Sequence, residues 1–134
     1  MRGELERFIR QHGLQACVTI TGWISSERVK QEWLAARTMV LVSFAEGLPV
    51  MIMEAMALGR TVLTTGTPEL ERHGVDDWLV PAGGLQALAA GLAKALATPA
   101  DKLQDMGSAA RTRVIERHNI DTEAAKLQRF LLHS

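Results

Sequence analysis

The chain has 134 residues, of which 47% are hydrophobic and 22% charged, a composition typical of one globular domain. Basic and acidic residues both number 15, and this zero net charge argues against a nucleic-acid-binding protein. The single cysteine, Cys17, excludes an intrachain disulfide and favours a reducing compartment. There is no signal-peptide pattern, and no apolar run reaches the ~20 residues that span a bilayer. We therefore expect a cytoplasmic protein, or one bound peripherally at the inner face of a membrane.

The first quarter of the chain predicts two helices separated by a strand. The first helix ends at Gly13. Residues 17–21 form an apolar strand pattern that should bury the thiol of the cysteine, and residues 22–24 form a loop at its end. Ser25 or Ser26 caps the second helix. The residues expected to face inward from the two helices are Leu5, Phe8, Ile9, His12, Val29, Trp33 and Ala36.

The remainder of the chain alternates strands with helices. Strands are predicted at residues 39–42, 61–64 and 78–80. The first of these is apolar at every position, as expected of a parallel strand covered on both faces. A turn leads into a short helix from Pro68 to about Arg72, and the chain is helical beyond Gly84. In the last predicted helix, which Asp121 caps, the inward residues are Ala124, Leu127 and Leu131.

This alternation predicts an α/β fold with a parallel sheet and right-handed crossovers. Ligands of such sheets bind at the carboxyl ends of the strands. The Trp23 loop, the turn at residues 43–49 and the turn at residues 65–68 are therefore expected on one rim of the sheet.

The central feature is a short helix predicted from about Pro49 to Leu58. Proline suits the first helical position, and Gly59 suits the C-terminal cap. The helix is apolar all round, which predicts burial, yet Glu54 lies in its middle. A buried carboxylate is costly unless it is paired, and the helix contains no basic residue. Either a distant cation or the hydroxyl groups of a ligand should meet Glu54.

The turn before this helix supports a ligand site. Gly47 lets a ligand approach the backbone closely, and the free N–H groups of a helix N-terminus favour phosphate. Together with Glu46 and Glu54, which can accept hydrogen bonds from sugar hydroxyls, these groups suit a nucleotide sugar. The alternative is a core helix with a structurally paired Glu54 and a surface Glu46. The residues alone leave both interpretations open.

Glu46 and Glu54, with seven residues between them, resemble the paired-glutamate motif of the retaining GT-B glycosyltransferases of family four. The stretch Ser-Phe-Ala-Glu-Gly-Leu-Pro at residues 43–49 is similar to that of bacterial transferases that build exopolysaccharides and other surface glycans. The resemblance runs from about Val18 to the C-terminus. It includes Gly22-Trp23, Ala36-Arg37, Gly59-Arg-Thr-Val62, Pro68-Glu69-Leu70 and Trp78-Leu-Val-Pro81.

The resemblance implies that residues 1–134 form a single, partial C-terminal GT-B domain, a Rossmann-like sheet with flanking helices and a helical tail. It also implies hexosyl transfer from a UDP-sugar or GDP-sugar without a metal. Glu54 would hold the ribose hydroxyls, while Glu46 would contact the donor sugar and is the expected catalytic residue. The other residues that the resemblance assigns to the donor are Gly47, Leu48, Pro49 and Val50 near phosphate, Trp23 and Ile24 near the base, and Thr65, Gly66 and Glu69 in a closing loop.

Three features of the family have no counterpart here. The opening strands, with their Gly-Arg and Lys-Gly cations for the donor phosphates, are missing, and so is the acceptor domain. The loop before Pro68 is also shorter than usual. We therefore expect a fragment or one half of a split enzyme, with an open sheet edge through which two copies could pair. A non-catalytic remnant or partner subunit is the main alternative, and a nucleotide-binding regulator is a weaker one.

Overall fold

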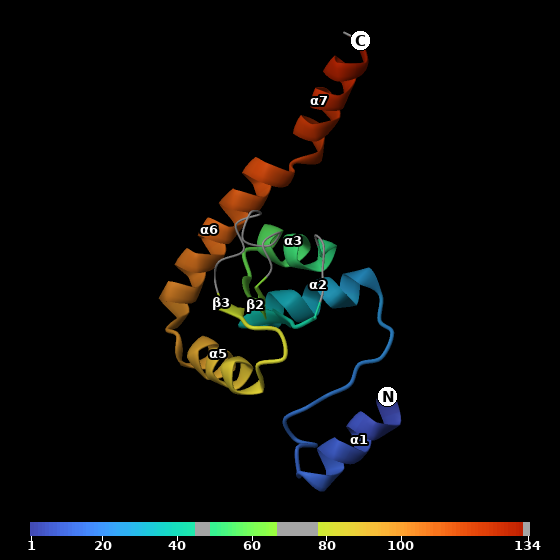
Figure 1. Ribbon diagram of the computed structural model, residues 1–134, viewed down its shortest axis with the longest axis vertical. Coiled ribbons are helices and arrows are strands. Elements are labelled where there is room, and N and C mark those ends of the chain that lie inside the picture. The colour runs from blue at the N-terminus through green and yellow to red at the C-terminus, as the bar shows by residue number, and fades with distance from the viewer. Residues whose placement is uncertain (45–48, 67–77, 133–134) are drawn as a thin grey trace.

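The structure, a computed structural model, describes residues 1–44, 49–66 and 78–132. Its three strands form one parallel sheet in the order β1-β2-β3, and this confirms the predicted α/β architecture (Figure 1). The elements are α1 (Arg2–Gln11), α2 (Ser26–Ala35), β1 (Thr38–Leu41), α3 (Val50–Ala57), β2 (Thr61–Thr65), β3 (Trp78–Val80), α5 (Leu85–Ala97), α6 (Ala100–His118) and α7 (Ile120–Leu132). Within the described residues, no helix is long and apolar enough to cross a membrane.

Helices cover both faces of the sheet, because successive side chains of a strand point to opposite faces. On β2, Val62 packs toward α3 and α6, whereas Leu63 packs toward α5, and both are completely buried. The first cluster contains Met39, Ile52, Ala55, Met56, Val62, Ala110 and Val114. The second contains Leu63, Trp78, Val80 and Ala95. The central strand β2 is therefore buried at all its positions, as a strand covered on both faces requires.

The strand β1 does not have the two-sided cover that its apolar sequence predicts. Met39 is buried, but Val40 remains 41% exposed, and Val42, just beyond the strand, is 45% exposed. Among the described strands only β2 pairs with β1, which leaves β1 at an edge of the sheet. Val40 and Val42 are exposed because no described strand lies beyond β1.

The expected strand at residues 17–21 is wrong. The chain turns there, with the amides of Cys17 and Val18 both donating to the carbonyl oxygen of Leu14, and the rest of the segment is irregular. Cys17 is exposed rather than buried. A strand needs a partner for its backbone groups, and none of the described strands lies beside this segment.

The last helix, α7, differs from prediction in its cap and in its burial. The side chain of Asn119, not Asp121, caps α7, by accepting from the amides of Asp121 and Thr122. The residues predicted to face inward are exposed, Leu127 by 60% and Leu131 by 67%, because α7 projects away from the sheet (Figure 1). These residues do lie on one face of a helix, as predicted, but their spacing does not say whether another element covers that face.

Two glycines bring α3 and α6 into close contact. Gly59 has φ of +69°, and the amides of Gly59 and Arg60 donate to the carbonyl oxygens of Met56 and Ala55. This is a Schellman cap, and it confirms Gly59 as the terminator of the central helix. Gly107 of α6 lies against the backbone of Gly59, and a side chain at position 107 would separate the helices. The predicted short helix from Pro68 lies outside the described residues.

Candidate functional site

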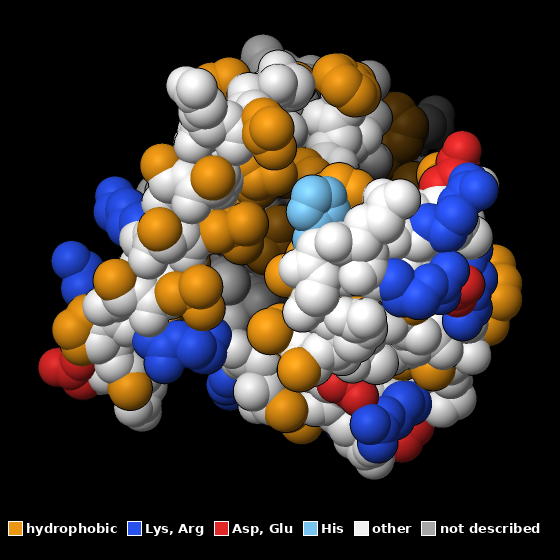
Figure 2. All heavy atoms as spheres, turned by 90° about the horizontal axis from the view of Figure 1, so that it is seen from below, with side chains coloured by type: hydrophobic (Ala, Val, Ile, Leu, Met, Phe, Trp, Pro, Cys, Tyr) orange, Lys and Arg blue, Asp and Glu red, His pale blue; other side chains and the backbone are white. Residues whose placement is uncertain are grey.

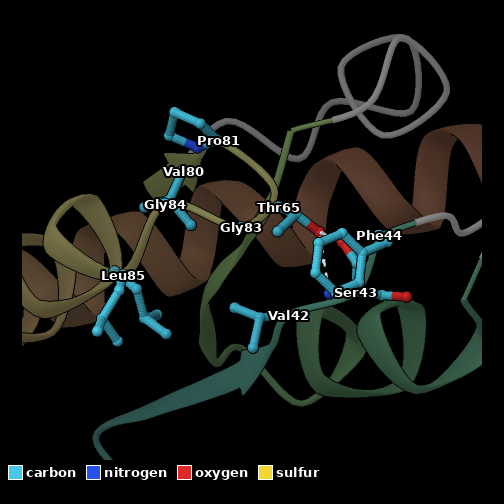
Figure 3. Close-up of a pocket in the computed structure, with 10 residues that line it drawn as sticks. Val42, Ser43, Phe44, Thr65, Val80, Pro81, Gly83, Gly84 and Leu85 are labelled. Atoms are coloured by element: carbon cyan, nitrogen blue, oxygen red, sulfur yellow. Dashed lines mark hydrogen bonds between the residues drawn. The ribbon is translucent and has the colours of Figure 1, made fainter.

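The carboxyl ends of the three strands meet at a small pocket of about 210 Å³ (Figure 3). This edge is where parallel α/β sheets bind their ligands. The pocket is lined by Val42, Ser43, Phe44, Thr65, Val80, Pro81, Gly83, Gly84, Leu85 and Leu88. It thus contains the start of the glutamate motif and one predicted site residue, Thr65.

Thr65 anchors the start of the motif. Its Oγ1 donates to the carbonyl oxygen of Ser43 at 2.8 Å and accepts from the Ser43 amide at 3.2 Å (Figure 3). The side chain is only 4% exposed, so both backbone groups are satisfied by one buried hydroxyl. Thr65 therefore fixes the direction in which the chain leaves β1 toward Glu46. The resemblance places Thr65 and Gly66 in a closing loop, and it gives no sign of this contact with Ser43.

We expect Thr65→Val to destabilise the protein by about 1–3 kcal/mol, because it removes a buried hydroxyl that bonds both the amide and the carbonyl of Ser43. The matched control is Thr112→Val, which removes an exposed hydroxyl that bonds only within its own helix. Its effect should stay within about 0.5 kcal/mol. Urea denaturation would measure both, and equal effects would show that the Ser43 contact contributes nothing specific.

The central helix begins one residue later than predicted. Val50 is its first helical residue, and Pro49 is the N-terminal cap, with an extended ψ of 113°. The carbonyl oxygen of Pro49 accepts from the Ile52 amide at 3.0 Å, so the helix still starts directly after the proline. Pro49 and Val50 therefore lie at the helix N-terminus, where free amides favour an anion. Their contact with donor phosphate remains a prediction.

Glu54 is exposed, which overturns the prediction of a carboxylate buried in an all-apolar helix. The helix α3 buries only Ile52, Ala55 and Met56, and Glu54 lies on its other side. There it lines a pocket of about 590 Å³ between α3 and α2, together with Trp33 and Lys30. Because solvent reaches this carboxylate, its presence in α3 needs no buried cation. It is available to accept hydrogen bonds from a ligand in the pocket.

The structure does not bring all predicted site residues together. Trp23 is fully exposed and lines a different pocket beside α1, with Met1, Arg2, Leu5, Ile20 and Gly22. Trp23 was expected on the rim because a strand was predicted at residues 17–21, and that strand does not form. The exposed indole does not pack against the core either. Ile24 is partly buried in the same connection. Their contact with the base remains a prediction.

Glu46, Gly47, Leu48 and Glu69 lie outside the described residues, so their predicted roles have no geometry here. The sites that can be described are therefore the Thr65 pocket at the strand ends and the Glu54 pocket between α2 and α3. Among the described residues, no three histidine, cysteine, aspartate or glutamate side chains are grouped as metal ligands. The expectation of a metal-free reaction remains untested.

Comparison with solved structures identifies the class of fold. The chain superposes on sucrose-phosphate synthase from Thermosynechococcus elongatus with a TM-score of 0.84 and 26% sequence identity, covering 98% of this chain and 34% of that one. Together with the parallel sheet and its flanking helices, this identifies a Rossmann-like fragment of the GT-B fold with a helical C-terminal tail. The family is equally clear. Residues 1–98 match the model of the glycosyl transferases group 1, and the chain belongs to this family.

Two curated relatives are named for the biosynthesis of amylovoran and of colanic acid. The chain is 37% identical over 99 residues to the amylovoran biosynthesis glycosyltransferase AmsK of Erwinia amylovora, covering 67% of this chain and 24% of the relative. It is 36% identical over 124 residues to the putative colanic acid biosynthesis glycosyltransferase WcaL of Salmonella typhimurium, covering 86% of this chain and 30% of the relative. The chain thus spans a quarter to a third of the length of these relatives.

Proposed function

We propose that this chain binds the nucleotide diphosphate sugar of a retaining hexosyltransferase of family four type, in the assembly of a bacterial surface polysaccharide. The observation that carries the proposal is Glu54, a carboxylate on the first helix after β1 that lines an open pocket in a chain of this family. Among the described residues, no hydrogen bond or ion pair is found for the side chain of Glu54, which leaves its carboxylate available to a ligand.

In this proposal Glu54 accepts hydrogen bonds from the ribose hydroxyls. Glu46 contacts the hydroxyls of the donor sugar and is the catalytic residue. The amides around Gly47, Leu48, Pro49 and Val50 face the diphosphate, since the N-terminus of α3 favours negative charge. The chemistry rests on positioning and on electrostatic stabilisation of the leaving diphosphate.

The donor is a UDP-sugar or GDP-sugar, and no metal is assigned. The acceptor and the missing phosphate cations come from a further domain or chain, and the assembled enzyme works in the cytoplasm or peripherally at the inner face of the membrane. Residues 1–134 act as a single, partial nucleotide-sugar-binding domain.

One observation favours a second function. The edge strand β1 exposes Val40, and the neighbouring Val42 and Phe44 are 45% and 85% exposed. A sheet edge of this kind suits a partner subunit, or a non-catalytic remnant, that pairs with another chain or with a second copy. Hydrophobic side chains are also gathered in the hollow of the face that Figure 2 shows.

Calorimetric titration of the purified chain with UDP, GDP and ADP, and with their sugar conjugates, distinguishes the two functions. Saturable binding of one base is expected if the chain is a donor module. A folded chain that binds none of them would contradict the proposal and favour the partner subunit or the remnant.

A further inference from the structure

A third pocket, of about 480 Å³, lies at the opposite edge of the sheet, where β1 and β2 begin. It is formed by the residues before these two strands and by the first three turns of α6. The lining residues are Ala36, Arg37, Leu58, Gly59, Arg60, Thr61, Ala100, Leu103, Gln104, Ser108 and Arg111. Three of them are arginines, and none is an aspartate or a glutamate. The pocket is therefore cationic, although the whole chain has no net charge.

Backbone carbonyls hold two of the arginines in place. Arg37 donates from Nη2 to the carbonyl oxygen of Thr98 at 2.6 Å and to that of Leu96 at 3.4 Å. Arg60 donates to the carbonyl oxygens of Ala36, at 3.4 Å from Nη1, and Leu58, at 3.5 Å from Nε. A guanidinium has five N–H groups, so each of these side chains is fixed and still has donors to spare. A cation fixed in this way loses less entropy when it binds an anion.

Helix capping explains these two arginines but not the third. The carbonyls that they contact end α2, α3 and α5, where the helix dipoles place partial negative charge. The side chain of Arg111 makes no such contact, and no hydrogen bond or ion pair is found for it among the described residues. It lies on the same face of α6 as Gln104 and Ser108, whose side chains add neutral donors. The N-terminus of α6, at Ala100, adds partial positive charge.

We propose that this pocket binds a soluble small molecule through a phosphate or diphosphate group. Planar guanidinium groups recognise phosphate oxygens with paired hydrogen bonds, and Arg37, Arg60 and Arg111 approach the pocket from three separate segments. The volume is within the range of small-molecule sites, and Leu58 and Leu103 supply an apolar wall for the remainder of the ligand. The site differs from the Thr65 pocket, which lies at the carboxyl ends of the same strands, and it shares only Leu58 with the Glu54 pocket of the proposed donor site.

The test is a titration of the full ¹⁵N-labelled chain with inorganic pyrophosphate, followed by the amide resonances in NMR spectra. Saturable shifts are expected at Gly59, Gln104 and Ser108. The amides of Ser43 and Gly66 report on the Thr65 pocket, and those of Val50 and Glu54 report on the proposed donor site, so that pyrophosphate bound there is not mistaken for this pocket. Shifts confined to these four amides, or no saturable shifts, would overturn the proposal.

Arg111→Gln should weaken the binding seen at Gln104 and Ser108 roughly tenfold, since it removes one charge-assisted interaction. The control is Arg7→Gln, the same substitution on the exposed face of α1 and outside the pocket, which should leave the affinity unchanged. If the two variants lost the same affinity for pyrophosphate, the effect would come from net charge alone and the proposed site would be refuted. Gln104→Glu places a carboxylate in the pocket and should weaken binding at least as much as Arg111→Gln. It provides a second test if the Arg111→Gln variant does not fold. Binding to phosphatidylglycerol vesicles without any response to pyrophosphate would overturn the assignment to a soluble ligand.

Discussion

Gly107→Ala should be among the most damaging single substitutions in the described part of the chain, with a loss of at least about 3 kcal/mol in the free energy of unfolding. A methyl group at this position would overlap the carbonyl oxygen of Gly59 and lie 2.8 Å from its carbonyl carbon. These are backbone atoms of a helix cap, and they cannot rotate away as a side chain can. The helices α3 and α6 would have to separate, which opens the first hydrophobic cluster.

Two other helical glycines provide the controls. A methyl group at Gly91 would lie 2.7 Å from Cδ1 of Leu63, a side-chain atom, so Gly91→Ala should cost only about 1 kcal/mol. Nothing lies within 4 Å of a methyl group at Gly3, so Gly3→Ala should be neutral or stabilise by up to about 1 kcal/mol. Urea denaturation of the three variants should rank them in this order. Similar losses for Gly107→Ala and Gly91→Ala would show that α6 adjusts without cost.

Glu54→Ala should weaken nucleotide binding by about ten- to a hundredfold, the effect of losing charge-assisted hydrogen bonds to the ribose hydroxyls. Glu46→Ala should weaken the binding of the nucleotide alone much less, because its proposed contacts are with the sugar of the donor. Calorimetry with the nucleoside diphosphate and with its sugar conjugate measures both effects. If Glu54→Ala and Glu46→Ala lost the same affinity for the nucleotide alone, the proposed division of roles between the two glutamates would be wrong.

Because Glu54 is exposed, its replacement should leave the melting temperature almost unchanged. Glu116→Ala on the exposed surface of α6 is the matched control for the loss of one negative charge. It should change neither stability nor affinity. A lower affinity in Glu116→Ala would point to long-range electrostatics rather than to a contact in the Glu54 pocket.

The order and type of most elements, though not of residues 17–21, could be predicted because they depend on local patterns. The Schellman cap at Gly59, the Ser25 cap, the three strands from β1 to β3 and the helix α5 all follow from periodicity and from residues with fixed backbone preferences. These signals are local, and the structure agrees with them to within a residue or two.

Burial could not be predicted, because it depends on what lies beside an element. The apolar sequence of α3 suggested a helix buried all round, but only one side contacts the sheet, so Glu54 is exposed. The same reason applies to α7, whose Leu127 and Leu131 are exposed, and to residues 17–21, with which none of the described strands pairs. The Thr65–Ser43 contact joins residues 22 positions apart, and no local pattern signals it.

The path of α6 has a consequence for cooperativity. Its first half contributes Leu103 and Met106 to the cluster under α5, and its second half contributes Ala110 and Val114 to the cluster under α3. One rigid helix therefore belongs to both hydrophobic cores, and neither core can open without disturbing the other. Amide protons of β2, α3 and α5 should exchange with solvent through a single global unfolding event, whereas those of α7 should exchange through independent local opening.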